Sequence, residues 1–352
     1  MRFIVTKLVM YMAFTPSILL AGQTQFNYEL NLLAGYEDGD AVYVVPGQRP
    51  AVGFEYYRVV SGEYGDVGRV DIQARFSADP NGAYESPYVL TPFHEAAPAP
   101  AVHVELHNAY GHVKAARGRA DLWLGHRDVA FGLEPTLDTH GAMLQTFAFD
   151  TFGFKKDWGA GVQGRFEKWD YRAAATLGSG VAVAGHGNWL AAGRLGFLDA
   201  AVDTAAFGLS AAYGEVLPTR GLVVVAPETR ETMLTGMDFA LRRGRFGVRA
   251  EGILGYVVDA PAGGYWVRGS ASFPDWRWLE AAVQGSAFYE DLYAGPPVVR
   301  AGAELTARYN AALTPGLSYF LVDDGSGPTR HAAFFHLYYF YPTPTRWLPE
   351  RR

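Results

Sequence analysis

The sequence contains no cysteine among its 352 residues. This absence excludes disulfide bonds, lipidation of a thiol, zinc–thiolate sites and iron–sulfur clusters. Long apolar runs are also missing: the longest lies between Leu8 and Leu20 and is interrupted by Thr15, Pro16 and Ser17. Because a membrane-spanning helix needs about 20 consecutive apolar residues, the sequence predicts no such helix.

The N-terminal run has the pattern of a secretory signal peptide. Arg2 and Lys7 precede the apolar stretch, which ends in the small residues Ala21 and Gly22. We therefore expect residues 1–22 to be removed on export. Without these two cations, 28 of the 30 basic residues remain against 36 acidic ones, a net charge of −8. Net charge therefore does not indicate nucleic acid as a partner.

Glycine and aromatic residues are abundant, with 41 Gly, 21 Tyr and 22 Phe. This mixture of turn-forming and strand-favouring residues is unusual for a helical protein. From Gln25 onward, apolar residues alternate with polar or small ones over stretches of about ten residues, as in membrane-spanning strands. Between Val299 and Tyr309, for example, every odd position is apolar.

A soluble sandwich would alternate in the same way, so the length of the strands decides between the two classes. Phe246 and Tyr256 lie on one apolar face, at a separation of about 33 Å in an extended strand. With tilt, that distance matches the apolar band between two aromatic girdles. The pattern predicts an all-β fold, a transmembrane antiparallel β-barrel of about sixteen strands.

Residues 23–341 are expected to form the barrel, and residues 342–352 a C-terminal periplasmic extension. Long and short connections alternate in strict order, and an even strand number places both ends of the barrel on the periplasmic side. The predicted strands cover residues 25–35, 50–60, 67–77, 101–113, 119–130, 153–166, 169–178, 188–199, 203–214, 230–242, 244–258, 264–274, 276–290, 297–310, 312–322 and 331–341.

Leu122–Pro135 has the pattern of a strand with its following loop, and Lys156–Arg165 and Tyr171–Gly180 have the pattern of the next two strands. In this order and spacing, the three segments resemble the phosphate-selective porin family of outer-membrane β-barrels. The resemblance implies a porin-type barrel in the bacterial outer membrane, often a homotrimer, in contact with outer-membrane lipid and lipopolysaccharide. It also implies a loop folded into the lumen after the fifth strand. Here that loop, Leu133–Asp150, contains no Lys or Arg. We therefore do not expect this chain to share the phosphate selectivity of that family.

Charged residues on the predicted polar faces are expected to line water, because Arg or Lys facing lipid at the bilayer midplane costs about 2 to 4 kcal/mol. A mixed-charge wall braced by ion pairs is the simplest interpretation, and a basic ladder that conducts anions is the functional alternative. The constriction loop would place Glu134, Asp138, His140 and Asp150 near the passage. The predicted pore-lining residues are Arg69, Asp71, Arg75, Arg119, Asp121, Arg127, Arg165, Arg172, Arg249, Glu251, Arg300 and Glu304.

His103, Glu105 and His107 suggest a metal site, because they share one predicted strand face. Residues four apart on a strand are about 13 Å apart, however, too far for both imidazoles to bind one ion. No Gly-x-Ser-x-Gly, His-Glu-x-x-His or Walker-type motif is present. We therefore expect no metal, no cofactor and no enzymatic activity.

The sequence thus predicts an outer-membrane porin through which small hydrophilic solutes or ions diffuse passively. The alternative is a structural or partner-binding barrel whose external loops contact another molecule while the lumen is plugged. Uptake of hydrophobic molecules is disfavoured, because the predicted inner faces carry many charges.

Overall fold

The structure is a computed structural model. No helix in its described part is both long and apolar enough to cross a membrane. It describes residues 23–37, 40–42, 50–62, 65–78, 102–116, 118–133, 151–197, 205–220, 223–224, 226–257, 260–276, 278–308, 312–323, 325 and 327–343.

Sixteen long strands follow one another along the described chain, and each overlaps one of the predicted ranges. Three short strands, β2 (Asp40–Val42), β11 (Thr219–Arg220) and β12 (Val223–Val224), lie between them. The long strands are β1 (Thr24–Glu37), β3 (Ala51–Gly62), β4 (Gly65–Ala78), β5 (Val102–Lys114), β6 (Asp121–Asp128), β7 (Lys156–Phe166), β8 (Trp169–Thr176), β9 (Trp189–Phe197), β10 (Ala205–Val216), β13 (Arg230–Arg243), β14 (Phe246–Val257), β15 (Ala260–Ser272), β16 (Leu279–Tyr289), β17 (Val298–Ala307), β18 (Leu313–Asp323) and β19 (Arg330–Thr343).

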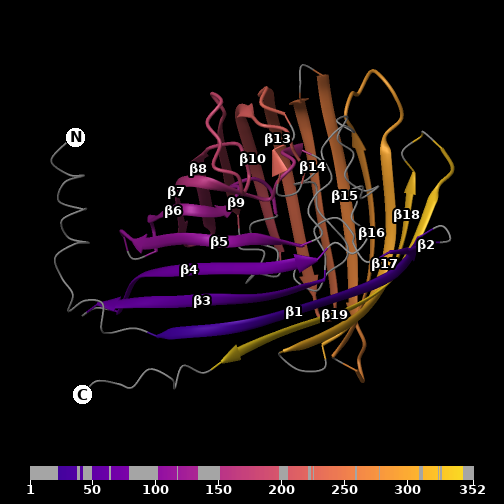
Figure 1. The fold of residues 1–352 in the computed structure, drawn as a ribbon, viewed down its shortest axis with the longest axis horizontal. Helices are drawn as coiled ribbons and strands as arrows, with labels where there is room; N and C mark the ends of the chain where they lie inside the picture. Colours follow the sequence, from indigo (N-terminus) through magenta and orange to yellow (C-terminus); the bar gives the residue numbers. More distant parts are fainter. Residues whose placement is uncertain are drawn as a thin grey trace.

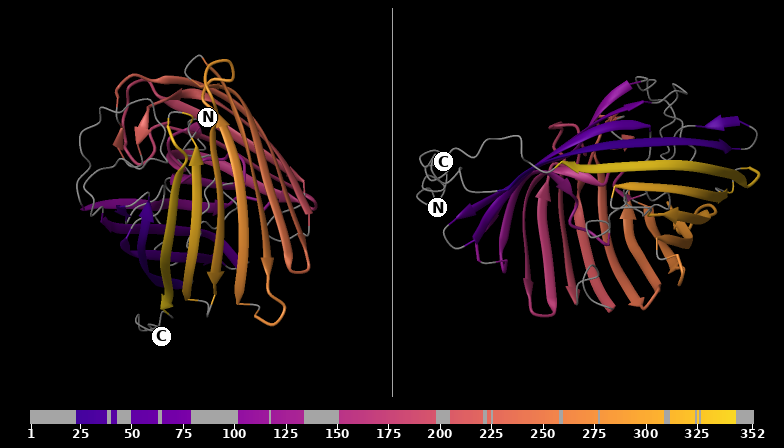
Figure 2. Two further views of the ribbon diagram at one scale, coloured as in Figure 1. Left: turned by 90° about the vertical axis from the view of Figure 1, so that its right-hand side faces the viewer. Right: turned by 90° about the horizontal axis from the view of Figure 1, so that it is seen from below.

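The long strands close into a barrel. Each pairs antiparallel with its sequence neighbour, and β1 pairs with β19 from Phe26 opposite Thr343 to Glu37 opposite Ala332. The two strands lie side by side along the lower part of Figure 1, and the wall is seen from two further sides in Figure 2. The predicted all-β barrel of sixteen strands is therefore confirmed. Closure leaves no free sheet edge, as membrane-spanning strands require.

The two faces of the wall differ in character. Along β10, odd-numbered residues such as Phe207 and Leu209 are mostly exposed, and even-numbered ones such as Ser210 and Ala212 are buried. The other strands repeat this division, with large apolar side chains on the exposed face. Phe246 and Tyr256 lie at the two ends of that face on β14, at 54% and 53% exposure, as the alternation predicts. The exposed apolar face points outward, and the buried face points into the barrel.

The connections differ from the prediction at one place. Only two residues join β14 to β15, at the end of the barrel where the other connections are longer, so the strict alternation of long and short connections is wrong there. The reason is that Ala260 to Gly263 continue the ladder by pairing with Val257 to Leu254. At the opposite end, Gly244 adopts a φ of 60° in the tight turn between β13 and β14, a conformation that favours glycine.

Strand β5 contains a β-bulge that the alternation does not predict. Gln73 pairs with Asn108 and Ala74 with Leu106, so His107 is the extra residue. The parity of the inward face therefore changes at His107, and the face continues through Asn108 and Tyr110. At the C-terminal end, β19 runs to Thr343, two residues beyond the predicted boundary of the barrel.

Candidate functional site

Both ends of the predicted constriction loop pack against the inner wall. Residues 134–150 lie outside the described residues, but Leu133 is fully buried, and Phe131, Phe152 and Phe154 are buried with it. The rings of Phe131 and Phe152 meet edge to face, with centroids 5.6 Å apart. These side chains form one apolar cluster with inward residues of β9, β10 and β13–β16, which include Leu190, Ala192, Ala212, Leu234, Ile253, Trp266 and Phe288.

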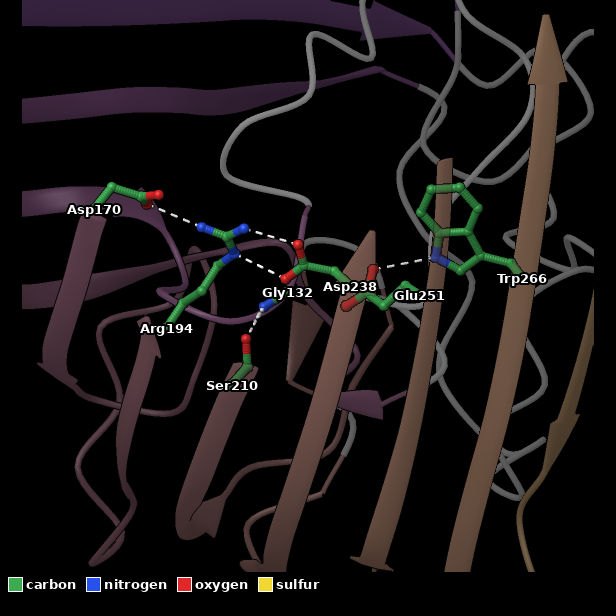
Figure 3. A network of polar contacts seen from close by, with 7 residues as sticks. All are labelled: Gly132, Asp170, Arg194, Ser210, Asp238, Glu251 and Trp266. Carbon is green, nitrogen blue, oxygen red and sulfur yellow. Dashed lines mark hydrogen bonds and ion pairs between the residues drawn. The ribbon is translucent and has the colours of Figure 1, made fainter. Parts of the chain in front are cut away.

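Gly132 fixes the first end of the loop. Its amide nitrogen donates a hydrogen bond to Ser210 Oγ on β10, at 3.0 Å. Its φ is 62°, and a Cβ atom here would lie 1.8 Å from Glu251 Oε1 on β14. Glu251 in turn accepts a hydrogen bond from Trp266 Nε1 on β15, at 3.1 Å (Figure 3). The close backbone approach therefore requires glycine, and it anchors the loop to three strands of the wall.

Gly153 fixes the second end of the loop. It has a φ of 81°, and a Cβ atom here would lie 2.6 Å from Thr219 Oγ1. Thr219 belongs to the short β11–β12 hairpin, between β10 and β13. The buried Leu217 lies just before it and donates its amide to Gly178 O at 2.7 Å. The loop is thus pinned at both ends to the same side of the barrel.

An ion triad centred on the buried Arg194 lies beside the Gly132 anchor on the inner wall (Figure 3). Arg194 of β9 binds Asp238 of β13 through Nε and Nη2, at 2.8 and 2.7 Å, and binds Asp170 of β8 through Nη1 at 2.9 Å (Figure 3). The Arg194–Asp238 pair crosses β10 at Gly208, where a Cβ atom would lie 2.4 Å from both side chains. A bidentate pair of this kind is stronger than a single contact, and it ties β9 to β13 across the strand between them.

The opposite part of the wall carries a chain of polar contacts from β7 to β1. Lys156 donates to Asn108 Oδ1 at 2.9 Å, and Asn108 donates to Gln73 Oε1 at 3.3 Å. Gln73 and Arg75 both donate to Glu29 Oε2, at 3.1 and 2.9 Å. The contact between Arg75 and Glu29 crosses β3 at Gly53, as the Arg194–Asp238 pair crosses β10 at Gly208. This part of the wall is therefore hydrophilic.

Two arginines on this wall lie against aromatic rings. The guanidinium carbon of Arg69 lies 5.8 Å from the ring centroid of Tyr57 and 5.2 Å from that of Tyr110, whose hydroxyl it also binds. That of Arg127 lies 4.8 Å from the ring centroid of Tyr110 and 5.7 Å from that of Trp123. Cation–π contacts of this type hold an arginine without cancelling its charge.

Most predicted pore-lining residues occupy inward positions of the strands. Arg119 does not belong to a strand, because β6 begins at Asp121, and it lies exposed in the turn after β5. The constriction residues Glu134, Asp138, His140 and Asp150 lie outside the described residues. The inward positions hold the other pore-lining residues, Arg69, Asp71, Arg75, Asp121, Arg127, Arg165, Arg172, Arg249, Glu251, Arg300 and Glu304.

The residues predicted to line the pore do not include Arg194, Asp170 or Asp238. Arg194, Asp170 and Asp238 alternate with apolar or small residues on their strands, so each could be assigned to the polar face. Their grouping could not be predicted from the sequence, because it joins strands that are not adjacent. Among the described residues, no group of three His, Asp or Glu side chains is arranged to hold a metal ion.

The fold resembles solved outer-membrane porins. A loop-deletion variant of OmpT from Vibrio cholerae matches with a TM-score of 0.61 at 11% identity, over 91% of this chain and 100% of that one. OmpF of Salmonella typhi, solved with daunomycin, also matches at 0.61, with 14% identity over 93% and 99% of the two chains. This chain has the porin fold. An anion-selective porin from Comamonas acidovorans matches at 0.59, with 7% identity over 91% and 100%.

No protein-family model and no curated protein sequence matches this chain. The likeness to porins therefore lies in the fold, and it extends over the whole barrel. The resemblance to a porin-type outer-membrane barrel, drawn from residues 122–180, is confirmed at that level. The similar structures include an anion-selective porin, and they do not single out a phosphate-selective type.

Proposed function

We propose that this protein is a porin of the bacterial outer membrane that lets small hydrophilic solutes or ions diffuse through its barrel. The single observation that carries the proposal is the division between the faces of the closed wall. Large apolar side chains cover the exposed outer face, whereas ion pairs such as Arg75–Glu29 and Arg194–Asp238 lie on the inner face. Such a wall separates lipid from water, and passive diffusion needs no catalytic group or cofactor.

The passage is proposed to run along the β1–β8 side of the lumen. The loop is anchored on the β9–β16 side, through Gly132 and Gly153, and apolar packing fills the inner wall there. The pore-lining residues Arg69, Arg75 and Arg127 lie on the other, hydrophilic side. In this proposal Glu134, Asp138, His140 and Asp150 border the constriction from the loop.

One observation favours the alternative of a plugged barrel that binds a partner. Leu33, Val322 and Phe334 are inward residues of β1, β18 and β19, and they form a second apolar cluster. Apolar packing on this side of the lumen would narrow the bore further. The size of solute that passes is therefore the quantity that separates the two functions.

The family resemblance supports two finer proposals. The barrel assembles as a homotrimer, and its outer face contacts outer-membrane lipid and lipopolysaccharide. The outward small residues Ala173 and Ala175 on β8 are both exposed, and they would allow close approach of a second subunit. Cross-linking in native membranes tests the assembly.

Liposome swelling tests the proposed function. Purified protein is reconstituted into vesicles that are diluted into isosmotic solutions of sugars of increasing size. A diffusion pore predicts swelling rates that fall steeply with solute size. Folding is checked independently by the shift of the unheated barrel on gels. A correctly folded barrel that admits no sugar, not even a three-carbon polyol, would favour the plugged alternative.

A further inference from the structure

On the inner wall, most acidic side chains are buried, whereas most basic side chains are not. Among the described side chains at inward strand positions, ten are carboxylates, and seven of these are buried: Glu29, Asp71, Asp121, Asp157, Asp238, Glu251 and Glu304. Glu55, Asp170 and Glu280 remain partly exposed. Most of the negative charge of the wall is therefore withdrawn from the lumen surface.

The basic residues show the opposite distribution. Of thirteen at inward positions, only Arg75 and Arg194 are buried. The other eleven are half-buried or exposed: Arg69, Lys114, Arg127, Arg165, Arg172, Arg230, Arg242, Arg249, Arg268, Arg300 and Arg330. A solute in the lumen thus meets mainly guanidinium groups, although the whole chain carries a net negative charge.

The buried carboxylates are held by donors within the wall. Asp157 accepts hydrogen bonds from the amides of Trp158 and Ser179, at 2.9 and 3.3 Å, and from that of Gly178. Glu251 accepts one from Trp266. These short side chains end near the backbone, whereas arginine reaches several ångströms further toward the lumen. The separation by sign follows from side-chain length together with these hydrogen bonds.

Arg69 and Arg127 stand out among these eleven cations, and both are half-buried. Each is held by aromatic rings, which fix its position and leave its positive charge in place. Both lie on the β1–β8 side, opposite the anchored ends of the loop at Gly132 and Gly153. Arg172, on β8, is a third half-buried cation at an inward position on this side. Guanidinium groups therefore outnumber the partly exposed carboxylates at the described inward positions of β1–β8.

We infer that the pore prefers anions over cations, and that Arg69 and Arg127 are the main residues that determine this preference. The inference rests on the proposed function, because it presumes a water-filled passage. Fixed charges at a narrow passage raise the local concentration of the opposite ion. The effect is largest at low ionic strength, where the Debye length is about 10 Å at 0.1 M salt and longer below it.

The experiment measures the reversal potential of the purified protein in a planar bilayer across a tenfold gradient of potassium chloride. The reversal potential is expected to have the sign that arises when chloride carries most of the current. Arg127→Gln and Arg69→Gln are each expected to lower the chloride-to-potassium permeability ratio by roughly twofold or more, since each removes one fixed charge from the passage. Arg127→Lys keeps the charge and is expected to retain most of the preference.

Arg243→Gln is the matched control, because Arg243 is exposed at an outward position near the end of β13. It removes the same charge from the protein and should leave the ratio unchanged. Arg172→Gln, at a half-buried inward position of β8, provides a second test should an arginine held by rings be needed for folding. It should lower the ratio as well.

A conducting barrel that prefers potassium, or shows no preference, overturns this inference and leaves the proposed function intact. An equal effect of Arg243→Gln and Arg127→Gln would also overturn it, because net charge alone would then account for the ratio. A folded barrel that conducts no current overturns the proposed function and this inference together.

Discussion

Single glycines allow charged residues to meet across a strand. Glu29 and Arg75 meet over Gly53, and Arg194 and Asp238 meet over Gly208. In each case the pair joins strands that are not hydrogen-bonded to each other. A buried pair of this type contributes little net stability. If a side chain fills the space above the glycine, or if one partner is removed, a buried charge loses its partner. The two glycines are therefore as important to the inner wall as the charged residues above them.

Gly208→Ala tests this interpretation. The added methyl group would lie 2.4 Å from both Arg194 Nη2 and Asp238 Oδ2 and would displace the pair. We expect a loss of about 1 to 3 kcal/mol in the free energy of unfolding, as for overpacked cores. The measurement is the urea midpoint of barrels folded in lipid vesicles.

Gly285→Ala is the control for this change, because no atom lies within 4 Å of a Cβ added there. It introduces the same methyl group into a strand of the same barrel. Equal midpoints for the two variants would show that the pair tolerates the methyl group, contrary to this account.

The facing of single residues could be predicted from the sequence, because alternation with a period of two is a local property. The inward positions of Arg69, Arg127 and Glu304 follow from it directly. The partners of the inward residues could not be predicted, since contacts across a strand depend on register and on the small residue between them. The triad of Arg194 became evident only in the folded barrel.

At the scale of the element, each strand has one face for lipid and one for water. On β17, Ala303 is exposed on the outer face, and Thr306 lies on the inner face. The strand count and most strand positions could be predicted, because each strand repeats this division. The short connection between β14 and β15 and the bulge at His107 could not, because both depend on how neighbouring strands pair.

Ala303→Arg and Thr306→Arg test the facing of β17. An arginine at position 303 would face lipid, at a cost of about 2 to 4 kcal/mol near the bilayer midplane, whereas at 306 it would face the lumen. We expect Ala303→Arg to lower the yield of barrels folded into vesicles, and Thr306→Arg to fold nearly as well as the unchanged protein. Equal yields would contradict the assigned faces.

The loop between Leu133 and Thr151 is the element on which pore size depends most in this account. Its two ends are anchored through Gly132 and Gly153. Deleting Ala142 to Phe149 keeps both anchors and shortens the segment between them. We expect a higher single-channel conductance, because less of the chain then occupies the lumen.

A control deletion of Leu292 to Ala294 shortens the exposed connection between β16 and β17, where Tyr293 is 90% exposed. Its conductance should equal that of the unchanged protein. If the loop deletion also leaves the conductance unchanged in a folded barrel, residues 134–150 lie outside the passage, and the assignment of Glu134, Asp138, His140 and Asp150 to the constriction is wrong.

At the scale of the whole molecule, the barrel joins an apolar outer face to an inner wall with two unlike halves. Strands β9–β16 carry the apolar cluster that holds the loop, and strands β1–β8 carry the hydrophilic chain from Lys156 to Glu29. Strand number and closure could be predicted from the sequence. The division of the lumen could not, because it arises where the loop ends pack against the wall.

Single-channel recording tests the central claim, that the barrel encloses a water-filled passage. Purified protein, shown to be folded by its gel shift, is added at low concentration to a planar lipid bilayer in potassium chloride. We expect discrete, stable steps of conductance, each step marking one inserted pore or one assembly of pores. Steps should be absent with heat-unfolded protein. A folded barrel that inserts into the bilayer and stays electrically silent would contradict the account.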